Sequence, residues 1–138
     1  MSVRQLRLVV TASDYDAALA FYRDVLGLEE LGAFTGEHGA VTILDAGRAT
    51  LELSDPAHAD HIDDVEVGRR VAGHVRIAFE VDDVESVTRR LDAAGATVLA
   101  EPVETPWGSR NARLEAPAGL QLTLFQEPDG GGPEAVVA

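Results

Sequence analysis

The sequence has no cysteine among its 138 residues, and it has few basic and few aromatic side chains. Without cysteine, the chain can form no disulfide, no thiolate metal site and no thiol nucleophile. Its 11 Lys and Arg residues stand against 24 Asp and Glu residues, and the formal net charge of -13 would repel nucleic acid and acidic membranes. The sequence also lacks a membrane-length apolar run and a signal-peptide core. These absences predict a cytoplasmic protein with no nucleic-acid or membrane partner.

The residues that are present predict a single α+β domain. Apolar residues make up 46% of the chain, which is enough for a core, and 138 residues are too few for two ordinary domains. Helical spacing of apolar residues occurs within 13–27 and within 82–95. Strands are predicted near residues 6–12, 29–34, 40–45, 49–54, 74–81, 97–101, 110–115 and 120–126. The order βαβββ therefore occurs twice.

This repetition divides the chain into two modules. The predicted segments within domain 1–127 are a module at 3–54, a polar and turn-rich connector at 55–73, and a module at 74–127, followed by a disordered tail at 128–138. A shift of 69 residues superposes the modules and sets Arg7 on Arg76. Each helix would cover the outer face of a small sheet. The inner faces of one curved mixed sheet would then surround a cleft.

The segment "AGHVRIAFEVDD" at 72–83 indicates which side chains would line this cleft. One face of the predicted strand is apolar and suited to packing beneath a helix, with Val75, Ile77, Phe79 and Val81. The other face carries His74, Arg76 and Glu80. Solvent would explain a polar face on an antiparallel sheet. Because two modules face each other here, we expect these polar side chains to point into the cleft.

The most specific segments are "SDYDAALAFYRDVLGLEEL", "LELSDP", "VRIAFEVDDVESVTRRLDAAGATV" and "PWGSRNARLEAPAGLQLTLF". They resemble the vicinal oxygen chelate superfamily, which includes glyoxalase I, extradiol dioxygenases, and fosfomycin- and bleomycin-resistance proteins. The resemblance covers residues 5–127. It implies the glyoxalase/bleomycin resistance fold and a homodimer. It does not choose between an enzyme and a binding protein, because this fold hosts both.

The resemblance also implies four inward-facing positions where metal-dependent members hold a divalent ion such as Zn, Ni, Fe or Mn. In this sequence they fall on Arg7, Glu52, Arg76 and Thr123. Of these, Glu52 matches the ligand types that such sites use. A guanidinium group has no lone pair to donate, so Arg7 and Arg76 should exclude the metal. We therefore expect no cofactor.

Other residues keep a metal site open as an alternative. An alternative set of suitable donors consists of Gln5, Glu52, His74 and Gln121. Gln5, His74 and Gln121 each lie two residues before one of the four positions named above. His58 and His61 lie in the acidic connector, where we expect a solvated surface loop. His38 lies between glycines and is expected to be a turn residue.

Two aromatic residues complete the expected ligand site. Phe125 alternates with Thr123 onto the predicted inner face and would form a wall of the pocket. Trp107, in "TPWGSR", would either pack in the core at a strand entry or stack on a flat ligand at the mouth of the cavity. Both interpretations of Trp107 are compatible with its sequence context.

The charged residues also have two interpretations. Arg7 and Arg76 would pair with Glu52 and Glu80 as an internal ion-pair network that replaces a metal site. Alternatively, one arginine would remain available to bind a carboxylate, enolate or phenolate of a ligand through two hydrogen bonds. The two interpretations are compatible with each other.

We therefore favour a metal-free, non-catalytic protein that binds a small organic molecule, aromatic or anionic, and sequesters or carries it. This role is implied by the resemblance to bleomycin resistance proteins, which act in antibiotic resistance. The expected ligand-binding residues are Arg7, Glu52, Arg76, Trp107, Thr123 and Phe125. The alternative is a metal-dependent glyoxalase-like lyase or isomerase, or a ring-cleaving dioxygenase, with Glu52 as catalytic base. A further alternative is metal-free catalysis, with Glu52 or Glu80 as base and Arg76 stabilising an enolate.

Overall fold

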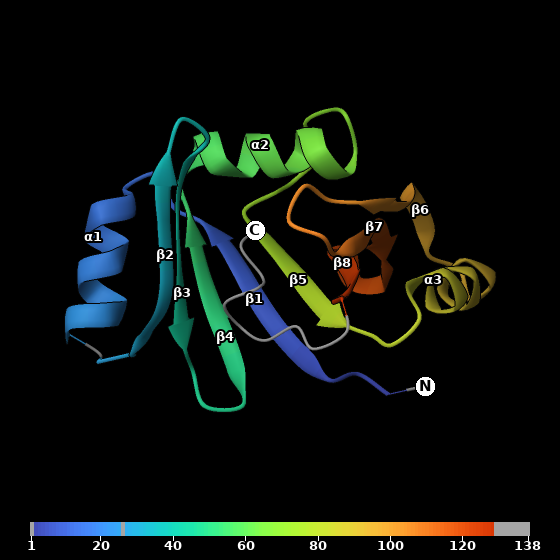
Figure 1. Cartoon of the computed structure of the whole chain (residues 1–138), viewed down its shortest axis with the longest axis horizontal. Helices are drawn as coiled ribbons and strands as arrows, with labels where there is room; N and C mark the ends of the chain where they lie inside the picture. The colour runs from blue at the N-terminus through green and yellow to red at the C-terminus, as the bar shows by residue number, and fades with distance from the viewer. Residues whose placement is uncertain (1, 26, 129–138) are drawn as a thin grey trace.

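The computed structural model describes residues 2–25 and 27–128 (Figure 1). Apart from Pro128, the predicted disordered tail lies outside the described residues. The elements are β1 (Gln5–Thr11), α1 (Tyr15–Leu19), the π-helical segment η1 (Ala20–Val25), β2 (Glu30–Gly36), β3 (Gly39–Asp45), β4 (Ala49–Ser54), α2 (Pro56–Glu66), β5 (Val75–Glu80), α3 (Val84–Ala93), β6 (Thr97–Glu104), β7 (Arg110–Ala116), the 3-10 turn η2 (Pro117–Gly119) and β8 (Leu120–Gln126). Within the described residues, every helix is too short or too polar to cross a membrane.

The strands form one mixed eight-stranded sheet in the order β2-β3-β4-β1-β5-β8-β7-β6. Within the first module β1 runs parallel to β4, and within the second β5 runs parallel to β8. The two modules join where β1 pairs with β5 in antiparallel orientation. The strand order on one side of this junction is therefore repeated on the other side. This topology confirms the predicted pair of βαβββ modules in a curved mixed sheet.

The helices that apolar periodicity predicts within 13–27 and 82–95 each begin with a capping contact. The Asp14 side chain accepts a hydrogen bond from the backbone N–H of Ala17 at 3.1 Å, at the start of α1. Asp83 accepts one from Ser86 at 3.1 Å, at the start of α3. Each carboxylate satisfies a backbone donor that would lack a partner in the first turn, which explains why both helices begin at these residues.

The outer face of the second module carries an apolar core beneath α3. Its fully buried members are Val81, Val84, Val87, Ala112, Leu114 and Leu124. Phe79 also packs against this cluster, as the alternation in the sequence predicts. The prediction is wrong for Val75, which is 39% exposed. Val75 is the first residue of β5, so it lies beyond the reach of α3.

The connector at 55–73 contains helix α2, where the sequence analysis expected only turns. Asp55 caps the helix by accepting a hydrogen bond from His58 N–H at 2.9 Å, and Pro56 occupies the first helical turn. The prediction failed because the buried face of α2 is largely polar: His58, Ile62, Asp63 and Glu66. Apolar periodicity cannot reveal a helix whose buried face carries charges.

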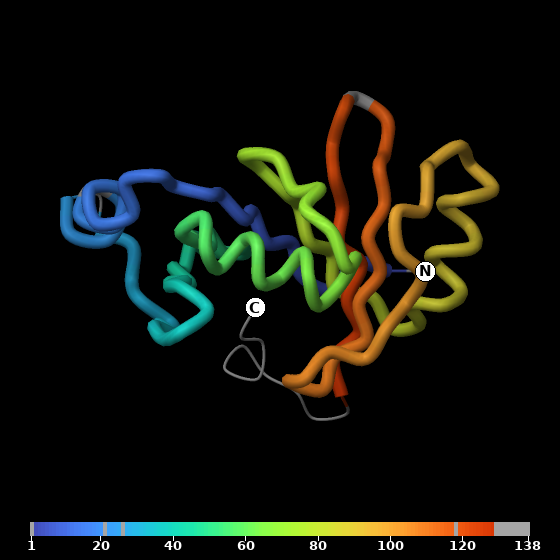
Figure 2. The backbone as a smooth tube through the Cα atoms, turned by 90° about the horizontal axis from the view of Figure 1, so that it is seen from above, coloured from blue at the N-terminus to red at the C-terminus, as the bar shows by residue number. Residues whose placement is uncertain are grey.

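Helix α2 extends across the sheet from the β2–β3 turn toward β7 and β8, as Figures 1 and 2 both show. It contacts β3, β4 and β7. The turn lies very close to the start of α2. A Cβ atom added to Gly39 would lie 2.5 Å from the His58 nitrogen and 2.3 Å from Asp55 Oδ1. Gly39 also has a φ of 87°. Only glycine allows this approach without strain.

Candidate functional site

A small cavity lies on the inner face of the sheet, with a volume of about 20 Å³. The structure brings all six predicted ligand residues to its lining: Arg7, Glu52, Arg76, Trp107, Thr123 and Phe125. Glu66, Ser109 and Asn111 also line it, although the sequence analysis did not single them out. A space of this size holds about one water molecule. The binding role of these residues therefore stays a prediction, to be tested with a ligand.

The strand register explains why residues so distant in sequence meet here. Val9 of β1 lies opposite Arg76 on β5 and opposite Glu52 on β4. Arg7 is two residues before Val9 and so shares its face, and Thr123 is brought to this face by the parallel pairing of β5 with β8. The centre of the site therefore lies at the junction of the two modules.

Arg7 is buried between an acidic and an aromatic partner. Its Nη1 lies 3.7 Å from Glu52 Oε2, and its Nε donates to Gln5 Oε1 at 3.0 Å. Its guanidinium carbon lies 4.5 Å from the ring centre of Phe125, a cation–π distance. Burial lowers the pKa of Arg7, while Glu52 acts in the opposite direction. The predicted ion pair between Arg7 and Glu52 is therefore confirmed.

Arg76 is buried without a carboxylate partner. Its Nη1 donates to Thr123 Oγ1 at 2.7 Å, and the residue is only 8% exposed. In the described part of the chain Arg76 forms no ion pair, so the expected pairing with Glu80 is absent. Glu80 Oε2 instead lies 3.9 Å from Arg4 Nη1. Burial lowers the pKa of Arg76, whereas the nearby carboxylates of Glu66, Glu52 and Asp63 raise it, so carboxylates that it does not pair with directly offset its charge.

Glu52 is the most deeply buried acid of the cavity, at 1% exposure. Among the described residues, its Oε1 has no hydrogen-bond partner. Burial raises the pKa of this carboxyl, and the positive charges of Arg7 and Arg76 only partly oppose the rise. Glu52 can therefore hold a proton more readily than a surface glutamate, which suits it to donate or accept a proton.

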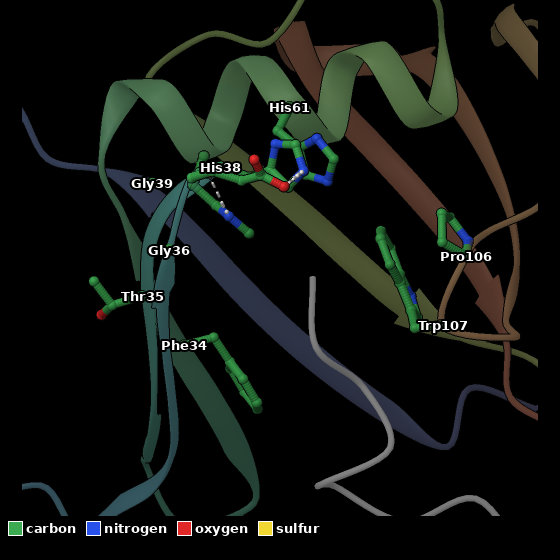
Figure 3. A pocket seen from close by; sticks show the side chains of 10 residues that line it. Phe34, Thr35, Gly36, His38, Gly39, His61, Pro106 and Trp107 are labelled. Carbon is green, nitrogen blue, oxygen red and sulfur yellow. Dashed lines mark hydrogen bonds and ion pairs between the residues drawn. The ribbon is translucent and has the colours of Figure 1, made fainter.

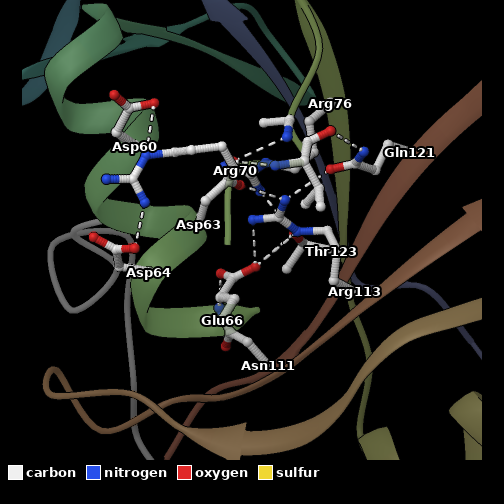
Figure 4. Close-up of polar contacts among 12 residues, drawn as sticks. Asp60, Asp63, Asp64, Glu66, Arg70, Arg76, Asn111, Arg113, Gln121 and Thr123 are labelled. Atoms are coloured by element: carbon white, nitrogen blue, oxygen red, sulfur yellow. Dashed lines mark hydrogen bonds and ion pairs between the residues drawn. The ribbon is translucent and has the colours of Figure 1, made fainter. Parts of the chain in front are cut away.

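A network of buried polar contacts connects α2 to the inner face (Figure 4). Arg113, which is 0% exposed, lies 2.8 Å from Asp63 and 2.9 Å from Glu66. Its Nη1 also donates to Gln121 Oε1 at 2.7 Å. Burial alone would raise the pKa of Asp63, but the Ala72 and Val71 amides and Arg113 together lower it. Through Glu66, which lines the cavity, this network forms part of the cavity wall.

A signal for this network was present in β7. Asn111, Arg113 and Glu115 alternate with small and apolar residues along "RNARLEA". This is the same two-faced pattern that marked β5, and it could have placed Arg113 on the inner face. The acidic partners had no comparable signal, because Asp63 and Glu66 lie in a segment that was interpreted as turns.

The structure does not bring the alternative metal set together. Because β1 and β5 are antiparallel, moving two residues back along each strand leads in opposite directions. Gln5 lies opposite Glu80, whereas His74 lies beyond the Val10–Val75 pair at the other end of the strands. Gln5 and His74 are therefore separated by about six residues along β5, or roughly 20 Å. The proposed combination of Gln5, Glu52, His74 and Gln121 is therefore wrong as a single site.

The four positions that the resemblance assigns to a metal do not fit one either. A cation among them would face the guanidinium groups of Arg7 and Arg76, both of which are buried and neither of which can act as a ligand. Throughout residues 2–25 and 27–128, no group of three or more acidic or histidine side chains is arranged to hold a metal ion. The two guanidinium groups at these positions therefore oppose the binding of a cation there.

A second, open groove lies beside the cavity, between the β2–β3 turn, α2 and the loop before β7 (Figure 3). Its volume is about 440 Å³. Its walls are mainly aromatic and include Phe34, His38, His58, His61, Pro106 and Trp107. Trp107 lines both the groove and the cavity, so it lies at the boundary between them. This position agrees with the predicted place of Trp107 at a cavity mouth.

The histidines of this groove differ from the prediction. His58 is 6% exposed and belongs to α2, so the expected solvated loop is wrong. His38, as predicted, lies in the turn between β2 and β3. Its ring stacks on His61, with ring centres 3.8 Å apart and planes 9° apart. Burial lowers the pKa of His61, and the neighbouring His38 lowers it further. The stacked imidazoles of His38 and His61 extend the flat wall of the groove.

Comparison with known sequences gives one family and several relatives. A sequence model described as Glyoxalase/Bleomycin resistance protein/Dioxygenase superfamily matches residues 4–131. A Mycobacterium tuberculosis protein (strain CDC 1551 / Oshkosh) named as the glyoxylase CFP32 is 32% identical over 113 residues, covering 80% of this chain. The chain spans only 39% of the length of that relative. A Synechocystis sp. protein (strain ATCC 27184 / PCC 6803 / Kazusa) named as a lactoylglutathione lyase is 28% identical over 128 residues, covering 88% of this chain and 93% of that protein.

Solved structures share the same fold at lower identity. A hypothetical protein from Bacillus halodurans C-125 superposes with a TM-score of 0.66 at 19% identity, covering 95% of this chain and 97% of that chain. A variant of Streptomyces coelicolor methylmalonyl-CoA epimerase, in complex with 2-nitronate-propionyl-CoA, has a TM-score of 0.66 at 24% identity. The match covers 96% of this chain and 100% of that chain. At these identities the likeness concerns the arrangement of strands and helices.

Proposed function

Because the chain belongs to the Glyoxalase/Bleomycin resistance protein/Dioxygenase superfamily, we propose that it binds a small organic molecule without a metal ion and sequesters or carries it. The ligand would lie in the open groove and extend toward the inner cavity, with Trp107 between the two spaces. This proposal places the protein among the binding members of a fold that also hosts enzymes.

The observation that supports this proposal is the burial of Arg7 and Arg76 where metal-dependent relatives would hold an ion. The two residues are 3% and 8% exposed. A guanidinium group donates hydrogen bonds and carries a permanent charge, so the pair suits an anionic or strongly polar part of a ligand. Arg76 is better placed for this role, since Arg7 already lies beside Glu52.

The sizes of the two spaces indicate how a ligand would bind. The groove, at about 440 Å³, falls in the range of about 300–1,000 Å³ that small-molecule pockets occupy. The cavity, at about 20 Å³, does not. A flat ring would therefore lie in the groove against Trp107 and Phe34, where stacking is favourable. The polar end would enter the cavity only after a side chain of its lining moves.

Metal analysis together with ligand titration tests this proposal. Trp107 is the only tryptophan, so its fluorescence reports directly on the groove. We expect the purified protein to contain no stoichiometric divalent metal. In a screen of flat aromatic metabolites and antibiotics, we expect ligands that change Trp107 fluorescence and raise the unfolding temperature.

Two variants sharpen the test. Trp107→Leu should weaken binding about ten-fold, measured by the thermal shift, because the stacking surface is removed. Leu120→Ala is a matched control, since Leu120 is 41% exposed and lines neither space. Stoichiometric metal whose chelation abolishes binding would contradict the proposal, as would a screen in which no ligand binds.

Glu52 supports a second candidate function, which is metal-free proton transfer. Its carboxyl is buried, its pKa is raised by that burial, and its Oε1 has no hydrogen-bond partner in residues 2–25 and 27–128. Glu52 would take a proton from the carbon next to a carbonyl group, and Arg76 would stabilise the enolate until the proton returns. The relatives named as a glyoxylase and a lactoylglutathione lyase add to the case for an enzyme.

Solvent deuterium exchange, followed by NMR, tests this second candidate on small carbonyl compounds that bind. Glu52→Gln should abolish exchange at the carbon beside the carbonyl. Glu80→Gln is the control, because Glu80 lies beside Arg4 and does not line the cavity. Exchange that persists in Glu52→Gln would reject Glu52 as the base.

A further inference from the structure

Glu66, the last residue of α2, is held by four hydrogen-bond donors from β7 and β8. Its Oε1 accepts from Arg113 Nε at 3.0 Å, Arg113 Nη2 at 2.9 Å and Thr123 Oγ1 at 3.1 Å. Its Oε2 accepts from Asn111 Nδ2 at 2.8 Å. We call Arg113, Asn111 and Thr123 the carboxylate cradle. A guanidinium, an amide and a hydroxyl around one carboxylate form the kind of arrangement that recognises carboxylate ligands.

Besides the ion pair of Arg113 with Asp63 on α2, the cradle is held in place by contacts from outside this helix. The Ser109 hydroxyl donates to Asn111 Oδ1 at 2.7 Å, which turns the amide nitrogen toward the carboxylate. Thr105 Oγ1 lies 3.0 Å from Ser109 Oγ and extends this chain of hydrogen bonds. Gln121 accepts from Arg113 at 2.7 Å. The donors are therefore preorganised by β7, β8 and the preceding loop, whereas the resident carboxylate comes from a separate element.

The cradle opens onto the inner cavity. Glu66, Asn111 and Thr123 all line the cavity together with Arg76. Arg76 donates to the same Thr123 hydroxyl at 2.7 Å and has no ion pair within the described residues. A carboxylate bound in the cradle would therefore lie beside a second guanidinium group, as Figure 4 shows for Glu66 itself.

We propose that the ligand carries a carboxylate that binds in the cradle, and that Glu66 occupies the cradle until this ligand displaces it. The inference rests on the proposed function, since it names the ligand class for the same site. Exchange of one carboxylate for another leaves the charge around Arg113 unchanged, so no buried cation loses its counter-ion. A neutral ligand would leave cradle donors without an acceptor, which is costly in a buried site.

The position of Glu66 at the end of α2 allows it to leave without unfolding the whole helix. Asp63, one turn earlier, contacts Arg113 separately at 2.8 Å and can stay in place. The amides of Val67 and Gly68 both donate to the Asp63 carbonyl, at 2.8 and 2.9 Å. Opening these two bonds would release the last turn and withdraw Glu66. Helix ends open at a lower free energy than helix centres.

Removal of the resident carboxylate tests the inference. We expect Glu66→Ala to bind sodium acetate and sodium benzoate about ten-fold more tightly than the wild-type chain, because neither salt must then displace Glu66. Affinity is measured from the rise in unfolding temperature at constant ionic strength. Acetamide and benzamide, which have nearly the same shape without the charge, should show no such gain. Asp64→Asn is the matched control, because it removes an exposed carboxylate of the same helix that pairs with Arg70.

Two further measurements cover the case in which Glu66→Ala does not fold. Glu66→Gln keeps the shape of the side chain and should show a smaller gain in the same direction for acetate. In the wild-type chain, benzoate should speed hydrogen exchange at the Val67 and Gly68 amides, because the last turn of α2 opens. The Ala59 amide, bonded to the Asp55 carbonyl at the start of α2, should be unaffected.

The outcomes separate this inference from the proposed function. Equal affinity for acetate in Glu66→Ala and wild type, or an equal gain for the amides, would overturn it. Unchanged or slower exchange at Val67 and Gly68 would also overturn it. If neutral aromatic compounds bind the wild-type groove and carboxylates gain nothing, the binding function stands and the carboxylate inference fails. If no compound binds any form of the chain, both fail.

Discussion

Helices α3 and α2 cover opposite faces of the sheet through different kinds of contact. Beneath α3 the buried side chains are apolar, among them Val84, Leu114 and Leu124. Beneath α2 the main contacts are charged, between Arg113 and the carboxylates of Asp63 and Glu66. Apolar contacts add up roughly in proportion to buried area and have no required direction. A buried charged network instead depends on every partner being present.

This difference has a functional consequence. The apolar layer under α3 can only hold its helix, because it offers nothing for a polar ligand to bind. The charged layer under α2 can exchange one acidic partner for another of the same charge. The inner face therefore combines structural support with a capacity for ligand binding, and variants of the two layers should respond differently.

The largest effect is expected from the loss of Arg113. Arg113→Met would leave Asp63 and Glu66 buried without their ion-pair partner, at a cost of about 3–5 kcal/mol in the free energy of unfolding. Urea denaturation followed by circular dichroism measures this change. The double variant Arg113→Met/Glu66→Leu should recover part of the loss, because one buried charge is removed. If Arg113→Met alone leaves stability unchanged, the charged network does not hold α2.

A smaller and simpler effect is expected in the apolar layer. Leu124 is 1% exposed, and Leu124→Ala should lower the free energy of unfolding by about 3 kcal/mol through loss of contact and formation of a cavity. The loss should be nearly the same at pH 4 and pH 7, since none of the surrounding side chains titrates. A strong pH dependence of this loss would show that the two layers are not independent.

A pH-dependent effect is expected for Asp63. The fold lowers the pKa of its carboxyl below the usual 3.8. Its ionised form therefore stabilises the folded chain above pH 3.8, and this contribution is lost as the pH falls through the lower folded value. Asp63→Asn should cost about 1–3 kcal/mol at pH 7. Chemical denaturation between pH 3 and pH 7 should show the difference from wild type shrinking toward the acidic end.

The smallest effect is expected on the exposed side of α2. Asp64 pairs there with Arg70, and both side chains are more than half exposed. Asp64→Asn should leave the unfolding midpoint unchanged, because exposed ion pairs are screened by water and salt. A clear loss of stability in this variant would mean that the position of α2 depends on its surface charges as well.

Much of the fold could be predicted from residue patterns. Alternation over residues 74–81 placed Phe79 and Val81 beneath a helix, and apolar periodicity within 13–27 and 82–95 predicted α1 and α3. These signals are local, since they depend on neighbours within a few positions. Helix α2 was missed because its buried face carries His58, Asp63 and Glu66 and so lacks the apolar period that identifies helices.

The candidate site was also predictable in part, because several of its residues are marked by local signals. The family resemblance assigned Arg7, Glu52, Arg76 and Thr123 to inward-facing positions, strand alternation added Phe125, and the segment "TPWGSR" suggested Trp107; all six line one cavity. The alternative metal set failed because its members had to be related across strands. Gln5 and His74 seem equivalent by sequence offset, but the antiparallel pairing of β1 with β5 separates them.

The amino-acid sequence was sufficient to specify two βαβββ modules and an inner face rich in polar side chains, because periodicity and capping are properties of short segments. It did not reveal that α2 would cover this face, or that Glu66 would sit among Arg113, Asn111 and Thr123. Those contacts join residues at least 45 positions apart. They form only once the complete sheet has assembled. The burial of each charge is then balanced by a partner from another part of the chain.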